Sequence, residues 1–236
     1  MKKITTVLFD LDGTLIRMDQ DEFIRLYFVS ILGKLGSLGY DTSVMRTALE
    51  GAVVATLRND GSLSNEERFW ETFEALSGKA DVVRREIDSY YEQEFNSVID
   101  ATCEAYDRVG EVLTRVKKKG LRSILATNPL FPMVATHARI RLGKMSADDF
   151  EYITAYENSS YCKPDPAYFT ELLTKLDISP DECVMIGNDT RDDFSAHALG
   201  IPVFVLTECL INTPNVDLSA YPHGGFDELL AFIDSL

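Results

Sequence analysis

Four short apolar runs rich in β-branched residues constrain the fold of this 236-residue chain more than any other feature. They lie at residues 4–9, 122–126, 183–186 and 202–206. Runs of this length without polar alternation are typical of buried parallel strands. Helical patterns precede the second and third runs, at residues 105–119 and 166–176. Strands that alternate with helices predict a parallel sheet with right-handed crossovers, which is an α/β fold.

Residues 16–104 interrupt this alternation. Four helical patterns follow one another in this segment, and no strand-like run lies among them. Ser64 and Glu67, three residues apart, form a capping-box pattern at the start of the third helix. We therefore expect a helical module at 16–104, inserted after the first strand of an α/β domain that residues 1–15 and 105–236 form.

The charge of the chain argues against two classes of partner. It has 23 Lys and Arg residues against 38 Asp and Glu residues, which gives a formal net charge of −15. Such a field repels nucleic acid and anionic membrane surfaces. No apolar stretch approaches the roughly 18 residues that a membrane span needs. We expect neither kind of partner, and a phosphate-bearing ligand would need local cations or a metal ion.

Cysteine usage and the N-terminal sequence indicate a cytoplasmic protein. The four cysteines form no CxxC pair and have no zinc-ligand spacing, so we expect free thiols in a reducing compartment. The residues before Asp10 are too few for the apolar core of a signal peptide. No obligate protein partner is evident from the sequence.

Polar residues that could carry chemistry stand at four places, at or just after the predicted strands. They are Asp10-Leu11-Asp12-Gly13-Thr14, Thr127-Asn128, Lys163-Pro164 and Gly187-Asn188-Asp189 through Asp193. Because the carboxyl ends of parallel strands build the ligand crevice of such sheets, we expect these groups to share one crevice. Clustered carboxylates need a cation, and Mg²⁺ takes one or two carboxylates together with substrate phosphate. A lysine and a hydroxyl nearby supply charge compensation and hydrogen-bond donors for a phosphoryl group.

Each of these residues also has an ordinary structural explanation. Asp10 could end a strand, Thr127 could cap a turn, and Lys163 could be a solvated charge. The acids of the last group could stabilise a helix N-terminus. The four groups occur together, however, and together they favour a phosphoryl-transfer site.

In this order, the four groups resemble the four motifs of the haloacid dehalogenase-like (HAD) hydrolase superfamily. The resemblance covers residues 1–15 and about 105–236, and the module at 16–104 lies where the family's C1-type cap lies. It implies an α/β fold in which a Rossmann-like parallel sheet core carries an inserted all-helical cap domain. It also implies a Mg²⁺ cofactor.

The resemblance further implies a role for each motif residue. Asp10 would be the nucleophile that becomes an aspartyl-phosphate, and Asp12 the general acid and then the base for water. Lys163 would neutralise the nucleophile and the transferring group, and Thr127 would hold a phosphoryl oxygen through its hydroxyl. The residues expected to bind the substrate phosphate are Asp12, Gly13, Thr127, Asn128 and Lys163.

For the metal, the resemblance implies Asp10, the backbone carbonyl of Asp12 and an acid of the fourth motif. Many relatives read Gly-Asp there, whereas this chain reads Gly-Asn-Asp, so the ligand position is shifted by one residue or replaced by an amide. Because Mg²⁺ prefers anionic oxygen, we expect Asp189 to bind, with Asn188 as the alternative. Asp193 would stand behind the ligands and orient Lys163.

Asp12 favours a phosphatase over a dehalogenase, because protonating an alkoxide leaving group needs an acid and displacing a halide does not. We expect a Mg²⁺-dependent phosphatase that acts on a small phosphorylated metabolite. Two alternatives stay open, namely a phosphomutase of the same superfamily and a non-catalytic binding or regulatory module on the same fold. The identity of the substrate is also left open.

Overall fold

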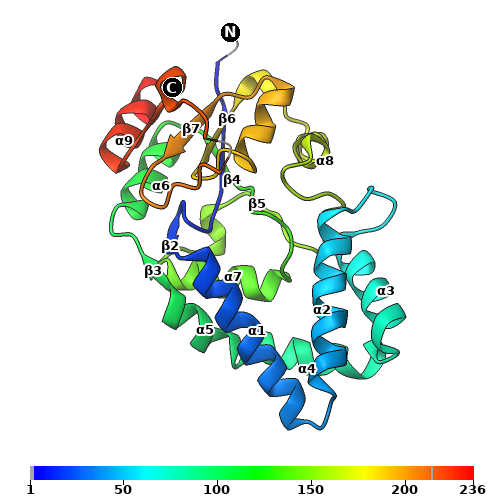
Figure 1. The fold of residues 1–236 in the computed structure, drawn as a ribbon. Helices are drawn as coiled ribbons and strands as arrows, with labels where there is room; N and C mark the ends of the chain where they lie inside the picture. The colour runs from blue at the N-terminus through cyan, green and yellow to red at the C-terminus, as the bar shows by residue number, and fades with distance from the viewer. Residues whose placement is uncertain (1–2, 214) are drawn as a thin grey trace.

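A six-stranded parallel sheet forms the centre of the protein in a computed structural model that describes residues 3–213 and 215–236 (Figure 1). The strand order is β5-β4-β1-β6-β7-β8. Their bounds are β1 (Thr6–Phe9), β4 (Arg122–Leu125), β5 (Tyr152–Ile153), β6 (Cys183–Gly187), β7 (Val203–Leu206) and β8 (His223–Gly224). All neighbouring strands pair in parallel, so the predicted α/β fold is confirmed.

Helices cover both faces of this sheet, because successive side chains of a buried strand point to opposite sides. Val7 and Phe9 of β1 pack in one apolar cluster with α6 (Val109–Lys118) and α9 (Phe226–Ser235). Leu8 packs in the other cluster with α8 (Pro166–Leu176), on the opposite face (Figure 1). Helix α8 begins where Asp165 accepts the backbone N–H of Ala167 and Pro166 occupies the first turn, which matches the predicted start.

Five helices, called here the cap helices, lie beyond the carboxyl end of β1 (Figure 1). They are α1 (Gln20–Ser37), α2 (Thr42–Leu57), α3 (Asn65–Ser77), α4 (Ala80–Glu92) and α5 (Phe95–Thr102). The capping box of Ser64 and Glu67 forms as predicted. The sequence pattern predicts only four helices here, and α5 is the one that it misses.

The structure differs from the sequence analysis at the two ends of this segment. β2 (Ile16–Met18) and β3 (Cys103–Ala105) pair antiparallel, so the two chain crossings between the sheet and the cap helices run side by side. Strands of three residues are too short to produce a readable periodicity. The same reason explains why the two-residue strands β5 and β8 were not predicted.

The cap helices contact the sheet domain through aromatic side chains as well as through this ribbon. Phe131, in the loop after β4, lies 5.8 Å from Phe23, 5.4 Å from Tyr27 and 6.2 Å from Phe95, measured between ring centroids. Such ring pairs contribute about 0.5–1.5 kcal/mol each beyond the apolar area that they bury. The cluster therefore stabilises α1 and α5 against the loop that follows β4.

A buried asparagine makes another contact between the two parts. Asn65, at the start of α3, is fully buried and donates its side-chain N–H groups to the carbonyl oxygens of Pro129 at 3.2 Å and Tyr161 at 3.3 Å. Its side-chain oxygen accepts from Asn59 at 2.9 Å. Asn65 thus ties α3 to two loops of the sheet domain.

Within the described residues, no helix is both long enough and apolar enough to cross a bilayer. The four cysteines, Cys103, Cys162, Cys183 and Cys209, are free thiols, and the first three are buried.

We predict that Asn65→Ala lowers the free energy of unfolding by about 1–3 kcal/mol, because buried hydrogen-bonding groups of Asn59 and of the two loops lose their partner. Urea denaturation measures this loss. Asn96→Ala is the matched control, since the Asn96 amide donates only to carbonyls of its own neighbourhood, and it should change stability by less than about 0.5 kcal/mol. Equal losses in the two variants would contradict the tethering role of Asn65.

Candidate active site

A cavity of about 330 Å³ lies between the carboxyl end of the sheet and the cap helices. All four motifs line it. The predicted site residues in its wall are Asp10, Asp12, Thr127, Asn128, Lys163, Asn188, Asp189 and Asp193, together with Asp192. Residues from four separate stretches of the sequence therefore meet at one edge of the sheet, as the strand-end argument predicts.

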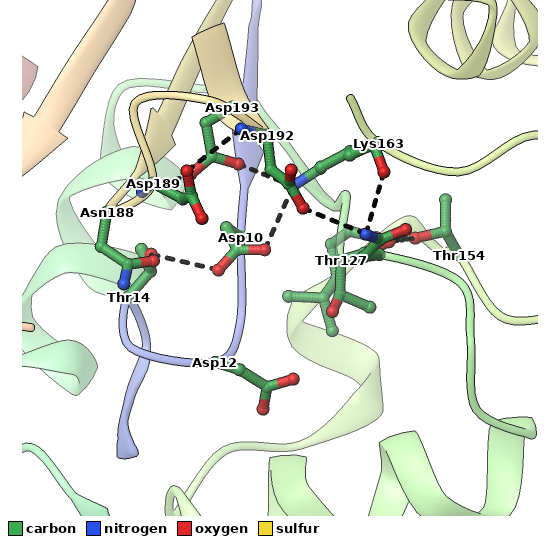
Figure 2. A network of polar contacts seen from close by, with 12 residues as sticks. Asp10, Asp12, Thr14, Thr127, Thr154, Lys163, Asn188, Asp189, Asp192 and Asp193 are labelled. Atoms are coloured by element: carbon green, nitrogen blue, oxygen red, sulfur yellow. Dashed lines mark hydrogen bonds and ion pairs between the residues drawn. The ribbon is translucent and has the colours of Figure 1, made fainter. Parts of the chain in front are cut away.

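Lys163 is buried between two carboxylates (Figure 2). Its Nζ lies 3.1 Å from Oδ1 of Asp10 and 2.7 Å from Oδ1 of Asp193. The rings of Tyr168 and Phe169 lie about 6 Å from the same nitrogen, at 5.8 and 6.0 Å from ring centroid to Nζ. The ammonium group is thus held in one position, and the structure places Asp193 where it orients Lys163.

The charges at this point shift the pKa of both partners. Burial raises the pKa of Asp10 to about 7; Lys163 opposes this shift, and the nearby charges of Asp193 and Asp12 add to it. Burial alone would lower the pKa of Lys163, but the charges of Asp10 and Asp193 raise it above its ordinary value. Lys163 is therefore a permanent cation, and the negative charge of Asp10 needs further positive charge nearby to be stable.

Asp12 forms a buried ion pair with Arg139, a residue that the sequence analysis did not select. Arg139 lies on α7 (Met133–Leu142), is 1% exposed, and has its guanidinium 4.9 Å from the centroid of the Phe131 ring. Burial raises the pKa of Asp12, and the charges of Arg139 and Lys163 act against that shift. Asp12 is thus a carboxyl group that takes up a proton more readily than an exposed aspartate.

The sequence does contain a signal that Arg139 is unusual. It follows the buried Ala135 by four residues, so both lie on the same face of α7, and a charge on the buried face of a helix is unusual. Without the fold, however, nothing indicates that Asp12 is its partner.

The loop after β1 turns at Gly13, where φ is +87°. A Cβ atom at Gly13 would lie 2.3 Å from Nδ2 of Asn188, so only glycine fits this close approach. The N–H of Gly13 donates to the carbonyl of Ile16 at 2.8 Å, and phosphate binding by Gly13 stays a prediction. Thr14 Oγ1 lies 2.9 Å from Oδ1 of Asn188 and 3.2 Å from Oδ2 of Asp10.

Asn188 and Asp189, the two alternatives for the metal, differ in how their side chains are used. The Asn188 amide has a partner at both ends, since Oδ1 accepts from Thr14 and Nδ2 donates to the carbonyl of Cys209 at 2.7 Å. One oxygen of Asp189 accepts the backbone N–H groups of Arg191 and Asp192, at 2.7 and 3.1 Å. The other oxygen accepts no hydrogen bond from any described residue, so it is the freer ligand.

Thr127 and Asn128 present donors to the cavity. The Thr127 carbonyl is fixed by the hydroxyls of Thr154 at 2.7 Å and Tyr168 at 3.0 Å, while the Thr127 hydroxyl has no partner among the described residues. The backbone N–H of Asn128 is likewise without a partner there. The Asn128 side chain donates to Asp192 at 3.1 Å and to the carbonyl of Lys163 at 3.2 Å. These free donors suit phosphoryl oxygens.

The donor set fits a divalent cation. Five aspartates line the cavity against two nearby cations, Lys163 and Arg139, so negative charge is in excess. Oδ1 of Asp12 is buried and has no partner, and its backbone carbonyl accepts no hydrogen bond from the described residues. No three His, Cys, Asp or Glu side chains of the described part converge tightly enough to form a metal cluster, and a set of two carboxylates and one carbonyl does not require it.

A parallel sheet under cap helices, with two aspartates after β1 and a buried lysine beside the first, is the arrangement expected of a HAD-type hydrolase. The comparison of the sequence with family models agrees. The model described as haloacid dehalogenase-like hydrolase matches residues 4–207. The chain belongs to this family, and it is a hydrolase.

Individual relatives and solved structures show what the chain is similar to. Pyrophosphatase PpaX of Bacillus cereus (strain Q1) is 26% identical over 190 residues, which cover 80% of this chain and 77% of the relative. A HAD phosphatase from Thermococcus onnurineus has a similar structure, with a TM-score of 0.60, 18% identity and 98% of each chain covered. For L-2-haloacid dehalogenase from Xanthobacter autotrophicus the TM-score is 0.58, with 16% identity and 99% of each chain covered. At these identities the two structures show the shared fold alone.

We predict that Arg139→Met lowers the free energy of unfolding by about 3–5 kcal/mol at pH 8, because it leaves the Asp12 carboxylate buried without its cation. The loss should be smaller at pH 5. Burial already raises the pKa of Asp12, and without Arg139 it rises further, so at low pH the group becomes neutral and the uncompensated charge disappears.

Urea denaturation at the two pH values measures this difference. Arg141→Met, an exposed arginine on the same helix, is the matched control and should have little effect at either pH. A loss for Arg139→Met that does not change with pH would mean that Arg139 stabilises the protein by packing alone.

Proposed function

We propose that the protein is a Mg²⁺-dependent phosphatase that hydrolyses a small phosphomonoester through an aspartyl-phosphate on Asp10. The observation that carries this proposal is the arrangement of Asp10 and Asp12 in one cavity. Asp10 is held beside the cation Lys163, and Asp12 has a raised pKa and an unpartnered oxygen. One carboxylate is thus suited to attack and the other to donate a proton.

In the first half of the reaction, an oxygen of Asp10 attacks phosphorus and the bond from phosphorus to the alcohol oxygen breaks. The leaving oxygen takes the proton of Asp12, so the alcohol departs neutral. Lys163, the Thr127 hydroxyl and the Asn128 backbone N–H stabilise the phosphoryl oxygens as charge develops on them. When bound, Mg²⁺ supplies positive charge to the phosphoryl group and to Asp10.

In the second half, Asp12 is a carboxylate and accepts a proton from water as the water oxygen attacks phosphorus. The bond from phosphorus to Asp10 breaks, inorganic phosphate forms, and both aspartates return to their starting states. Arg139 keeps Asp12 in place during both halves of the reaction. The guanidinium of Arg139 is buried and pairs with one oxygen of Asp12, which leaves the other oxygen of Asp12 free.

The phosphomutase alternative shares the first half of this reaction. A candidate β-phosphoglucomutase from Thermotoga maritima has the same fold, with a TM-score of 0.58 at 20% identity. A mutase must hold a sugar that carries two phosphates, which calls for a second cationic site. Among the residues that line the cavity, all of which are described, Lys163 is the only lysine or arginine. This observation favours hydrolysis.

We predict that Asp10→Asn lowers kcat on p-nitrophenyl phosphate with Mg²⁺ by roughly 10⁴-fold or more, because it removes the nucleophile. Circular dichroism should show an unchanged fold. Asp107→Asn, at a highly exposed aspartate, is the control and should keep normal turnover. Near-normal turnover by purified Asp10→Asn would refute the covalent mechanism.

We predict that Asp189→Asn raises the Mg²⁺ concentration for half-maximal activity by roughly 10- to 100-fold, whereas Asn188→Ala raises it less. The reason is that Asp189 has a free anionic oxygen and Asn188 uses both ends of its amide within the protein. Mg²⁺ titration of both purified variants provides the measurement. If Asn188→Ala alone weakens the response to Mg²⁺, then Asn188 is the ligand.

A further inference from the structure

The wall of the active-site cavity on the side of the cap helices is apolar. Seven side chains from the segment after the first motif form it, with two more from the loop after β4. They are Met18, Phe23, Ile24, Tyr27, Phe28, Val53, Leu57, Leu130 and Phe131. The opposite wall consists of the motif residues and is strongly polar. The cavity therefore has a phosphoryl end and an apolar end.

The apolar end offers almost no polar partner to a ligand. The Tyr27 hydroxyl is already bonded to that of Tyr91 at 2.7 Å, so only its ring is available. Gln20, which is uncharged and exposed, adds one amide to the wall. None of the described cap residues that line the cavity is Lys, Arg or His. Arg139 lies behind Phe131 and is paired with Asp12.

Which part of a substrate meets this wall follows from the proposed chemistry. Asp10, Thr127 and Lys163 fix the phosphoryl group at the polar end, so the alcohol part extends toward the cap helices. A hydroxyl, carboxylate or second phosphate placed there would lose its hydrogen bonds to water without replacement, which is unfavourable. An apolar group placed there gains from leaving water.

We infer that the substrate is a phosphomonoester whose alcohol part is uncharged and mainly apolar, such as an aryl or arylalkyl phosphate. The inference rests on the proposed function and names the substrate class of the same site. The cavity volume of about 330 Å³ suits a small alcohol of this kind, since ligand pockets begin at roughly this size. Pyrophosphate, which the name of the Bacillus relative specifies, would place a charged phosphate against the apolar wall.

Two apolar side chains of this wall are exposed to solvent, which supports the assignment of an apolar substrate. Ile24 on α1 is 51% exposed and Leu57 on α2 is 42% exposed, although both are large and apolar. A ligand in the cavity would cover part of this surface. Val29, on the same helix as Ile24, is 58% exposed and does not line the cavity, so it provides a matched control position.

The test compares one phosphate ester that has an apolar leaving group with phosphate substrates whose leaving groups are polar or charged. Phenylethyl phosphate and glucose 6-phosphate are both esters of primary alcohols, and phosphoglycolate and pyrophosphate add charged leaving parts. We expect kcat/KM with Mg²⁺ to be at least about 100-fold higher for phenylethyl phosphate than for each of the other three. Acetyl phosphate, whose leaving group is small, serves as the reference for phosphatase activity.

Two variants then test whether the apolar wall causes the preference for phenylethyl phosphate. Ile24→Lys should lower the ratio of kcat/KM for phenylethyl phosphate to that for acetyl phosphate by about 10-fold or more, as expected when apolar contacts in a pocket are lost. Val29→Lys should leave that ratio unchanged. If kcat/KM is higher for glucose 6-phosphate, phosphoglycolate or pyrophosphate than for phenylethyl phosphate, the inferred substrate class is wrong. The proposed phosphatase function would still stand. Absence of any Asp10-dependent hydrolysis, including that of acetyl phosphate, would overturn the proposed function and this inference with it.

Discussion

The position of one buried ammonium group determines how the rest of the site is arranged. A lysine that is 1% exposed is stable only beside carboxylates that compensate its charge, and Lys163 has two of them. This requirement brings the end of β1, the loop before α8 and the start of the helical turn after β6 to one point. Gly187 is part of the same constraint, because a Cβ there would lie 2.0 Å from an oxygen of Asp193. Three motifs are therefore positioned by one ion-pair network.

The two walls of the cavity belong to different segments of the chain. The polar wall comes from the ends of the sheet strands, whereas most of the apolar wall comes from the segment that begins at Met18 and includes α1 and α2. Phe131 connects the two, because its ring packs on α1 and α5 and also covers the guanidinium of Arg139. A change in the cap helices can thus alter the shape of the apolar wall without displacing Asp10. The contact through Phe131 also means that the support of Asp12 depends on where the cap helices lie.

How far the fold and the site could be predicted depends on the length of each pattern and on where its partner lies. The strands β1, β4, β6 and β7 are four or five residues long and lie in apolar runs, which the sequence predicts, and this prediction points to the motif residues that follow β1, β4 and β6. β5 and β8 are two-residue edge strands without periodicity. Helix α7 was missed because Arg139 interrupts its apolar face. Its pairing with Asp12 joins residues 127 positions apart and exists only in the folded chain.

The Gly-Asn-Asp sequence of the fourth motif also becomes understandable from the packing around it. The Asn188 amide lies over the turn at Gly13, accepts from Thr14 and donates to the carbonyl of Cys209. An aspartate in its place would direct a carboxylate oxygen at that carbonyl, and it would add negative charge close to Asp10, whose pKa is already raised by its surroundings. An amide, which has a donor at one end and an acceptor at the other, satisfies both neighbours without charge. The asparagine therefore connects the loops after β1 and β7, and the anionic oxygens of the motif are left to the residues that follow it.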